Sequence, residues 1–115
     1  MHELGIAGAV LEAVRAQAAL RPASRVRRIG LRVGALSGVN PDALSFCIEA
    51  LVRDTDLADV ALEIETPPRT HRCAGCDTTF EVSNYQFECP ECGSFQPACV
   101  GGTELELAFL ELEES

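Results

Sequence analysis

Two short cysteine pairs constrain this chain more than any other feature of its sequence. The first pair is Cys73 and Cys76, and the second is Cys89 and Cys92, each with two residues between its cysteines. Such a pair places two thiolates on one tight turn, and two turns facing each other offer a tetrahedron of sulfur to Zn²⁺. Because protein then fills all four positions, we expect a structural metal, and the function must lie elsewhere in the chain.

Other uses of the cysteines remain open at this point. Four thiolates also hold iron in rubredoxin-like electron carriers, which would be coloured. A disulfide framework fits less well, because paired thiols without a visible export signal indicate the reducing cytoplasm. A catalytic zinc enzyme is disfavoured by the closed four-sulfur site.

The overall charge and length exclude several classes of function. The chain has 115 residues and a net charge of −9, which disfavours both nucleic acid and an anionic membrane as partners. All nine basic residues are arginines, so the lysine of a nucleotide-binding P-loop is missing. No stretch approaches the roughly 20 apolar residues of a membrane span. The length suits one domain, or one domain with a small inserted module.

Hydrophobic periodicity predicts two helices and three strands around the cysteine segment. A helix is expected from about Glu3 to Arg21, and a second begins at Asn40-Pro41, with Asn40 as its cap. Strands are expected over about 25–36, 60–66 and 104–112. The alternation of the last strand slips near Ala108, which indicates either a bulge between residues 108 and 110 or burial of both faces.

These elements predict an α+β fold, a small three-stranded sheet with two helices and an inserted zinc-ribbon-like four-cysteine module. The order is helix, strand, helix, strand, zinc module, strand. We assign residues 1–68 with 100–115 to the main domain and 69–99 to the module. A segment below roughly 40 residues usually needs a metal to fold, and structural zinc contributes about 10–16 kcal/mol.

The amino terminus is the second candidate metal site. Met1, His2 and Glu3 bring a terminal amine, a backbone amide and an imidazole together, and these can close fused chelate rings around one ion. Nitrogen donors in a plane suit Ni²⁺ or Cu²⁺ better than Zn²⁺. The Glu3 amide or carboxylate could add a further donor. By itself, a histidine at position two is more often a solvated tail residue.

The two sites together give this sequence a family resemblance. A chain that starts Met1-His2-Glu3-Leu4 on an amphipathic helix, and carries the two cysteine pairs late in its length, resembles the HypA/HybF family. These are hydrogenase nickel-incorporation accessory proteins. The resemblance covers the whole chain, including the order of its elements.

The resemblance implies a cytoplasmic nickel metallochaperone that is not an enzyme. It implies Ni(II) as transported cargo, with His2 as principal ligand supported by Met1 and Glu3. It implies structural Zn(II) on Cys73, Cys76, Cys89 and Cys92. The implied partners are a HypB-type GTPase and the nickel–iron hydrogenase large-subunit precursor, with no nucleic acid and no membrane. A homodimer, formed by exchange of the module, is left open. The alternative function is a zinc-ribbon protein–protein adaptor without nickel.

Several other residues carry weaker expectations. We expect Cys47 to be a buried small apolar residue of the second helix, Cys99 to pack against the module, and His71 to be solvated. The arginines of the first strand form either a solvated face or a docking patch for an acidic partner; these are Arg25, Arg27, Arg28 and Arg32. Pairing with the glutamates of the last strand favours the solvated face.

Overall fold

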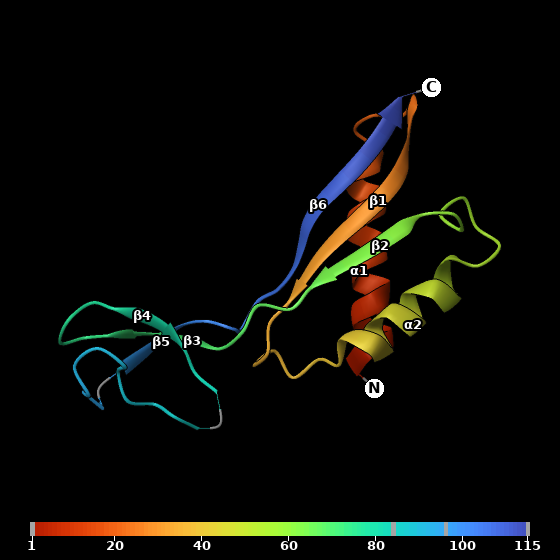
Figure 1. Cartoon of the computed structure of the whole chain (residues 1–115). Coiled ribbons are helices and arrows are strands. Elements are labelled where there is room, and N and C mark those ends of the chain that lie inside the picture. The colour runs from red at the N-terminus through yellow and green to blue at the C-terminus, as the bar shows by residue number, and fades with distance from the viewer. Residues whose placement is uncertain (1, 84, 96, 115) are drawn as a thin grey trace.

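The described part of the chain forms two sheets and two helices in an elongated arrangement (Figure 1). The computed structural model describes residues 2–83, 85–95 and 97–114. The helices are α1 (His2–Ala18) and α2 (Pro41–Val52). The strands are β1 (Ser24–Val33), β2 (Ala61–Glu65), β3 (Thr70–Cys73), β4 (Thr79–Glu81), β5 (Pro97–Gly101) and β6 (Leu105–Glu114). The principal extents are 54 × 29 × 17 Å.

The larger sheet has the order β2-β1-β6, and both helices cover one of its faces. β1 pairs with β2 in parallel and with β6 in antiparallel orientation. The core lies between the sheet and the helices and contains Ala7, Leu11, Val14, Ile29, Leu31, Val33, Leu44, Ile48, Val52 and Leu57. The predicted α+β fold, with three strands, two helices and an inserted cysteine module, is confirmed.

The helix boundaries follow from local chemistry, with one difference from the prediction. Asn40 caps α2, because its side-chain Oδ1 accepts a hydrogen bond from the Ala43 amide at 3.1 Å. α1 ends at Ala18, three residues before the predicted end at Arg21, in a turn that continues to the start of β1. Within the described residues, neither helix is long and apolar enough to cross a bilayer.

The predicted slip in the last strand is a β-bulge. Gly30 is opposite Phe109, whereas the next residue of β1, Leu31, is opposite Leu107. Ala108 is therefore an extra residue on β6, and it shifts the side-chain alternation by one position. As a result Leu107, before the bulge, and Leu110, after it, both pack against the core.

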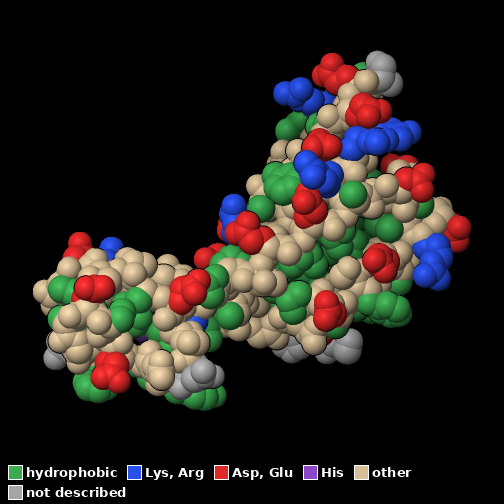
Figure 2. Space-filling model, viewed as in Figure 1, with side chains coloured by type: hydrophobic (Ala, Val, Ile, Leu, Met, Phe, Trp, Pro, Cys, Tyr) green, Lys and Arg blue, Asp and Glu red, His purple; other side chains and the backbone are tan. Residues whose placement is uncertain are grey.

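The uncovered face of this sheet carries interleaved charges (Figure 2). Arg28 lies 2.8 Å from Glu63 on β2 and 2.7 Å from Glu111 on β6. Arg32 lies 3.2 Å from Glu65 and 3.1 Å from Glu106 in the same way. These arginines are therefore paired across the strands, as expected for a solvated face rather than for a free basic docking patch.

The smaller sheet, with order β4-β3-β5, is joined to the larger one by two linkers that meet at the end of β1. The Ala35 amide donates to the Pro67 carbonyl of one linker at 2.9 Å, and the Leu36 amide donates to the Gly102 carbonyl of the other at 2.6 Å. The first strand was expected to reach Leu36 but ends at Val33, because the following amides bond these linkers.

Candidate metal centres

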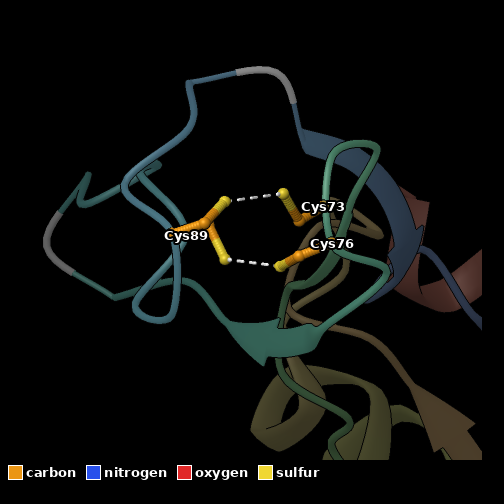
Figure 3. A group of neighbouring side chains, drawn as sticks. Cys73, Cys76 and Cys89 are labelled. Atoms are coloured by element: carbon orange, nitrogen blue, oxygen red, sulfur yellow. Dashed lines mark hydrogen bonds between the residues drawn. The ribbon is translucent and has the colours of Figure 1, made fainter.

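The four paired cysteines converge on one point at the end of the smaller sheet; Figure 3 labels Cys73, Cys76 and Cys89 of this group. One possible ligand atom of each lies within 4.8 Å of all the others. The Sγ atoms of Cys73 and Cys92 are 3.5 Å apart, and so are those of Cys76 and Cys89. In a tetrahedron with Zn–S bonds of about 2.3 Å, sulfurs lie about 3.8 Å apart. The sulfurs are thus close to the spacing that a four-coordinate ion requires, and too far apart for disulfides.

The two pairs are presented by turns of matching geometry. In the first turn the Asp77 amide donates to the Cys73 carbonyl, and in the second the Gly93 amide donates to the Cys89 carbonyl, both at 2.8 Å. Asp77 and Gly93 occupy the same position in their turns and both have positive φ, 64° and 75°. Residues that tolerate the left-handed region are needed there, and glycine and aspartate are among them.

The surroundings of the thiols favour thiolates at some positions and oppose them at others. The Cys76 amide, which points at the Cys73 sulfur, is the main reason that the pKa of Cys73 falls to about 6. The Thr78 side chain, 3.2 Å from the Cys76 sulfur, is the main cause of a lowered pKa for Cys76. For Cys92 the Ser94 amide favours the thiolate, but the three neighbouring cysteines and burial together outweigh it and raise the pKa of Cys92 to about 12. Four thiolates at this spacing repel one another, so a cation is needed to hold all four.

His71 is buried rather than solvated, which corrects the expectation from sequence. Its imidazole is 4% exposed and lies against the rings of Phe80 and Phe87, with centroids 6.2 and 6.0 Å away. Its Nε2 accepts a hydrogen bond from Arg69 Nε at 2.9 Å. Burial is the main cause of the lowered pKa of His71, and the positive charge of Arg69 adds to it. His71 therefore acts as part of the small core under the cysteines.

The remaining two cysteines stand apart from the four-sulfur cluster. Cys47 is half-buried and packs against the main core, close to its expected role. Cys99 is exposed on β5, and its Sγ is 3.4 Å from the Gly101 carbonyl oxygen. The expectation that Cys99 packs against the module is wrong, because its side chain faces solvent.

The structure describes part of the predicted amino-terminal site. Met1 and the side chain of His2 lie outside the described residues, and His2 is the first residue of α1. Glu3 accepts a hydrogen bond through Oε2 from the Asn40 amide at 3.3 Å. Since Asn40 caps α2, the first turns of both helices lie side by side at this end of the molecule (Figure 1).

The start of a helix has backbone groups that suit this chemistry. The first four amides of an α-helix have no acceptor within the helix. Because α1 begins at His2, the amides of His2 and Glu3 are among these, so a metal could use them without breaking helical hydrogen bonds. Positive partial charge at the two helix starts opposes a cation, so donors there must lose protons or supply negative charge.

Comparison with known proteins decides the family. The model of the family described as "Hydrogenase/urease nickel incorporation, metallochaperone, hypA" matches residues 1–112. The chain belongs to the HypA family. It is 42% identical over 98% of its length to the hydrogenase maturation factor HypA of Geobacter metallireducens, and 37% identical over the same share to that of Albidiferax ferrireducens; both are covered completely.

Two solved HypA structures share the fold. The solution structure of the Ni metallochaperone HypA from Helicobacter pylori has a TM-score of 0.65 at 18% identity, and the match covers 98% of each chain. A second, titled "Solution structure of HypA protein", has a TM-score of 0.72 at 20% identity, covering 98% of this chain and 97% of that one. At these identities the likeness shows the fold alone.

Three features of this HypA-family chain were not found from its sequence. Thr78 contacts the Cys76 sulfur, and a hydroxyl residue stands two positions after the second cysteine of both pairs, as Thr78 and Ser94. That repeated spacing was a signal in the sequence for a hydroxyl side chain close to each cysteine pair. The Arg69–His71 hydrogen bond and the Glu3–Asn40 hydrogen bond had no such signal. The second joins residues 37 positions apart, a separation that local patterns do not reach.

Proposed function

We propose that this chain carries Ni(II) on its amino terminus and helps deliver it to the large subunit of a nickel–iron hydrogenase during maturation. The observation that carries the proposal is the family match over residues 1–112 together with the Met1-His2-Glu3 start. The ligands are the Met1 amine, the His2 amide and imidazole, and the Glu3 amide or carboxylate. The chain itself catalyses no reaction.

A carrier has to release its metal, and the chemistry of the amino terminus favours release. The imidazole and the terminal amine have reference pKa values of about 6.5 and 7.7–8.0. Protons therefore compete with nickel near neutral pH, and binding weakens as the pH falls. The neighbouring helix starts add positive partial charge on the same side, as the Glu3–Asn40 contact indicates. Binding is thus expected to be weak enough to permit transfer.

The cysteine cluster has the opposite character, and we assign it structural Zn(II). Four soft thiolate donors suit Zn²⁺ or iron, and the absence of an open coordination position agrees with a structural role. Functionally, we divide the chain into the helices with the β2-β1-β6 sheet, which hold nickel, and the cysteine module, which holds zinc. Metal analysis of colourless protein with one zinc per chain would support this; red protein containing iron would contradict it.

The partners we propose are a HypB-type GTPase and the hydrogenase large-subunit precursor, all in the cytoplasm. The module presents exposed aromatic side chains that a partner could cover, with Tyr85 85% and Phe95 74% exposed. Protein binding by the module alone would describe the competing function, a zinc-ribbon adaptor without nickel. That function leaves His2 without a role.

Nickel titration of zinc-loaded, tag-free protein distinguishes the two functions. We expect saturable binding of one Ni²⁺ per chain in the unmodified protein and its loss in His2→Ala and in protein with an acetylated Met1. Glu3→Ala should weaken binding, whereas Glu12→Ala, an exposed carboxylate on the same helix, should not. Binding that survives His2→Ala would place the nickel site elsewhere. No binding to the unmodified protein would favour the adaptor.

A further inference from the structure

The outer edge of β6 is an unused sheet edge beside an apolar groove. β6 is the last strand in the order β2-β1-β6, and none of the described strands pairs with its outer side (Figure 1). Such an edge offers a row of backbone donors and acceptors to another extended chain. The strand runs over ten residues, and Leu105 to Leu107 precede the bulge at Ala108.

The hydrogen bonds to β1 fix which residues of β6 face this edge. The Gly34 amide donates to the Glu104 carbonyl at 2.7 Å, so the polar backbone groups of Glu104 point toward β1. Along a strand, successive residues point these groups to opposite sides. The amide and carbonyl of Leu105 therefore point away from β1, and so do those of Leu107. Both residues precede the bulge, so the alternation holds across them.

The side chains of the same two leucines line the groove. A cavity of about 270 Å³ opens between α1 and the sheet, bounded by Ile6, Ala9, Val10 and Ala13 on the helix and by Leu105 and Leu107 on β6. The alanines leave room that larger residues would fill, and Leu105 is 44% exposed. An extended chain added to this edge would place every second side chain in the groove.

The other side chains of an added strand would face the charged sheet surface. There each of Arg28 and Arg32 lies between two glutamates, so carboxylates outnumber guanidinium groups. A second copy of β6 is a poor occupant, because its own charged residues are all acidic: Glu106, Glu111, Glu113 and Glu114. A segment with basic residues at alternate positions would instead place them beside the β6 carboxylates of this face, Glu106 and Glu111.

We propose that the Leu105–Leu107 edge of β6 binds an extended segment of a partner protein in which apolar and basic side chains alternate. The apolar side chains enter the groove beside Ala9, the basic ones lie over the glutamates, and the backbone pairs with Leu105 and Leu107. This is addition of a strand to a sheet, in which main-chain bonds give affinity and side-chain pockets give specificity. Binding of this segment requires no metal at the amino terminus, so its test is independent of nickel binding.

The test uses zinc-loaded, ¹⁵N-labelled full-length protein without nickel, titrated with the peptide Lys-Val-Lys-Val-Lys-Val-Lys. We expect saturable amide shifts centred on Leu105, Leu107 and Ala9, with slowed hydrogen exchange at Leu105 and Leu107. The matched Glu-Val peptide should bind at least tenfold more weakly. Ala9→Phe, at an exposed position in the groove, should weaken binding tenfold, whereas Ala16→Phe, on the same helix outside the groove, should leave it unchanged.

Three results would overturn the proposal. Shifts spread over the acidic surface, without slowed exchange at Leu105 and Leu107, would show charge attraction alone. Equal affinity in Ala9→Phe and the unsubstituted protein would remove the groove from the interaction. Sedimentation that reveals dimers blocked by Ala9→Phe would make a second copy of the chain the occupant.

Discussion

Gly30 and Phe109 form a pair whose energy can be tested directly. The two residues are opposite each other on β1 and β6, and a β-carbon added at Gly30 would occupy the space of the Phe109 ring. The Arg28 guanidinium also lies over that ring, 5.5 Å from its centroid. Phe109 is 43% exposed, so a little over half of its side chain is removed from water. Gly30→Ala would therefore displace the ring from its site on the sheet.

The magnitude follows from two opposing effects. Full burial of a phenylalanine side chain is worth about 1.5–3 kcal/mol, so displacing a ring buried to this extent costs about 1–1.5 kcal/mol. Replacing glycine by alanine within a strand stabilises the folded protein by about 0.5–1 kcal/mol. We expect Gly30→Ala to lower the free energy of unfolding by about 0.5 kcal/mol, and to raise it by about 0.5–1 kcal/mol when Phe109 is already alanine. The coupling energy between the two substitutions is then about 1–1.5 kcal/mol.

Urea unfolding measures this coupling in a double-mutant cycle of four proteins: the unsubstituted chain, Gly30→Ala, Phe109→Ala and the double variant. All four are zinc-loaded, and unfolding is followed by the signal of the helices. Gly8→Ala serves as a matched control, because a β-carbon at Gly8 meets no neighbouring atom within 4 Å. That substitution should stabilise the protein by about 0.5–1 kcal/mol in either background. If the effects of the Gly30 and Phe109 substitutions on the free energy of unfolding are additive, the position of the Phe109 ring does not depend on the open space at Gly30, and the reasoning is wrong.

Three further results are expected. Removal of zinc by a chelator should abolish the dispersion of amide resonances in β3, β4 and β5 while α1 and the larger sheet stay folded, because no described residue of the module belongs to the main core; loss of all dispersion in the heteronuclear NMR spectrum would contradict this. Asn40→Ala should lower the free energy of unfolding by about 1 kcal/mol in denaturant titration, since it removes the cap of α2, and an unchanged midpoint would argue against the cap. His71→Ala should speed zinc loss to a chromogenic chelator several-fold by opening the packing around Phe80 and Phe87, whereas Arg72→Ala, on the exposed side of the same strand, should not.

Features encoded by local spacing were predictable from this sequence. The two cysteine pairs came together as expected, because each pair needs only its own turn and the turns need only face each other. The start of α2 was read correctly from Asn40 and Pro41, which act within one helical turn. The bulge at Ala108 was visible as a shift in the alternation of apolar and polar residues, because an extra residue moves every later side chain to the other face of the sheet.

Features that depend on distant partners were not predictable. His71 resembles a solvated residue in the sequence, and it is buried only because Phe80 and Phe87, from later segments, close over it. Cys99 is exposed on β5 although its pairing with β3 places it opposite the buried His71, and its neighbours in the sequence do not indicate this. The early end of β1 likewise reflects hydrogen bonds to linkers more than thirty residues away in sequence.

The contrast between the two candidate metal centres accounts for how one small chain could keep one metal and give up another. Four sulfurs from two matched turns surround the first site, and opening it means separating the two turns, the first of which continues directly from β3 and its buried His71. The second site, as we propose it, consists of a chain end and the first turn of α1, where no element has to unfold for the donors to change partner. The Glu3 carboxylate there accepts a hydrogen bond from the Asn40 amide, and that amide can compete with a metal for the same oxygen. A site of this kind exchanges its ion through protons and small side-chain movements, which is the property that a carrier requires.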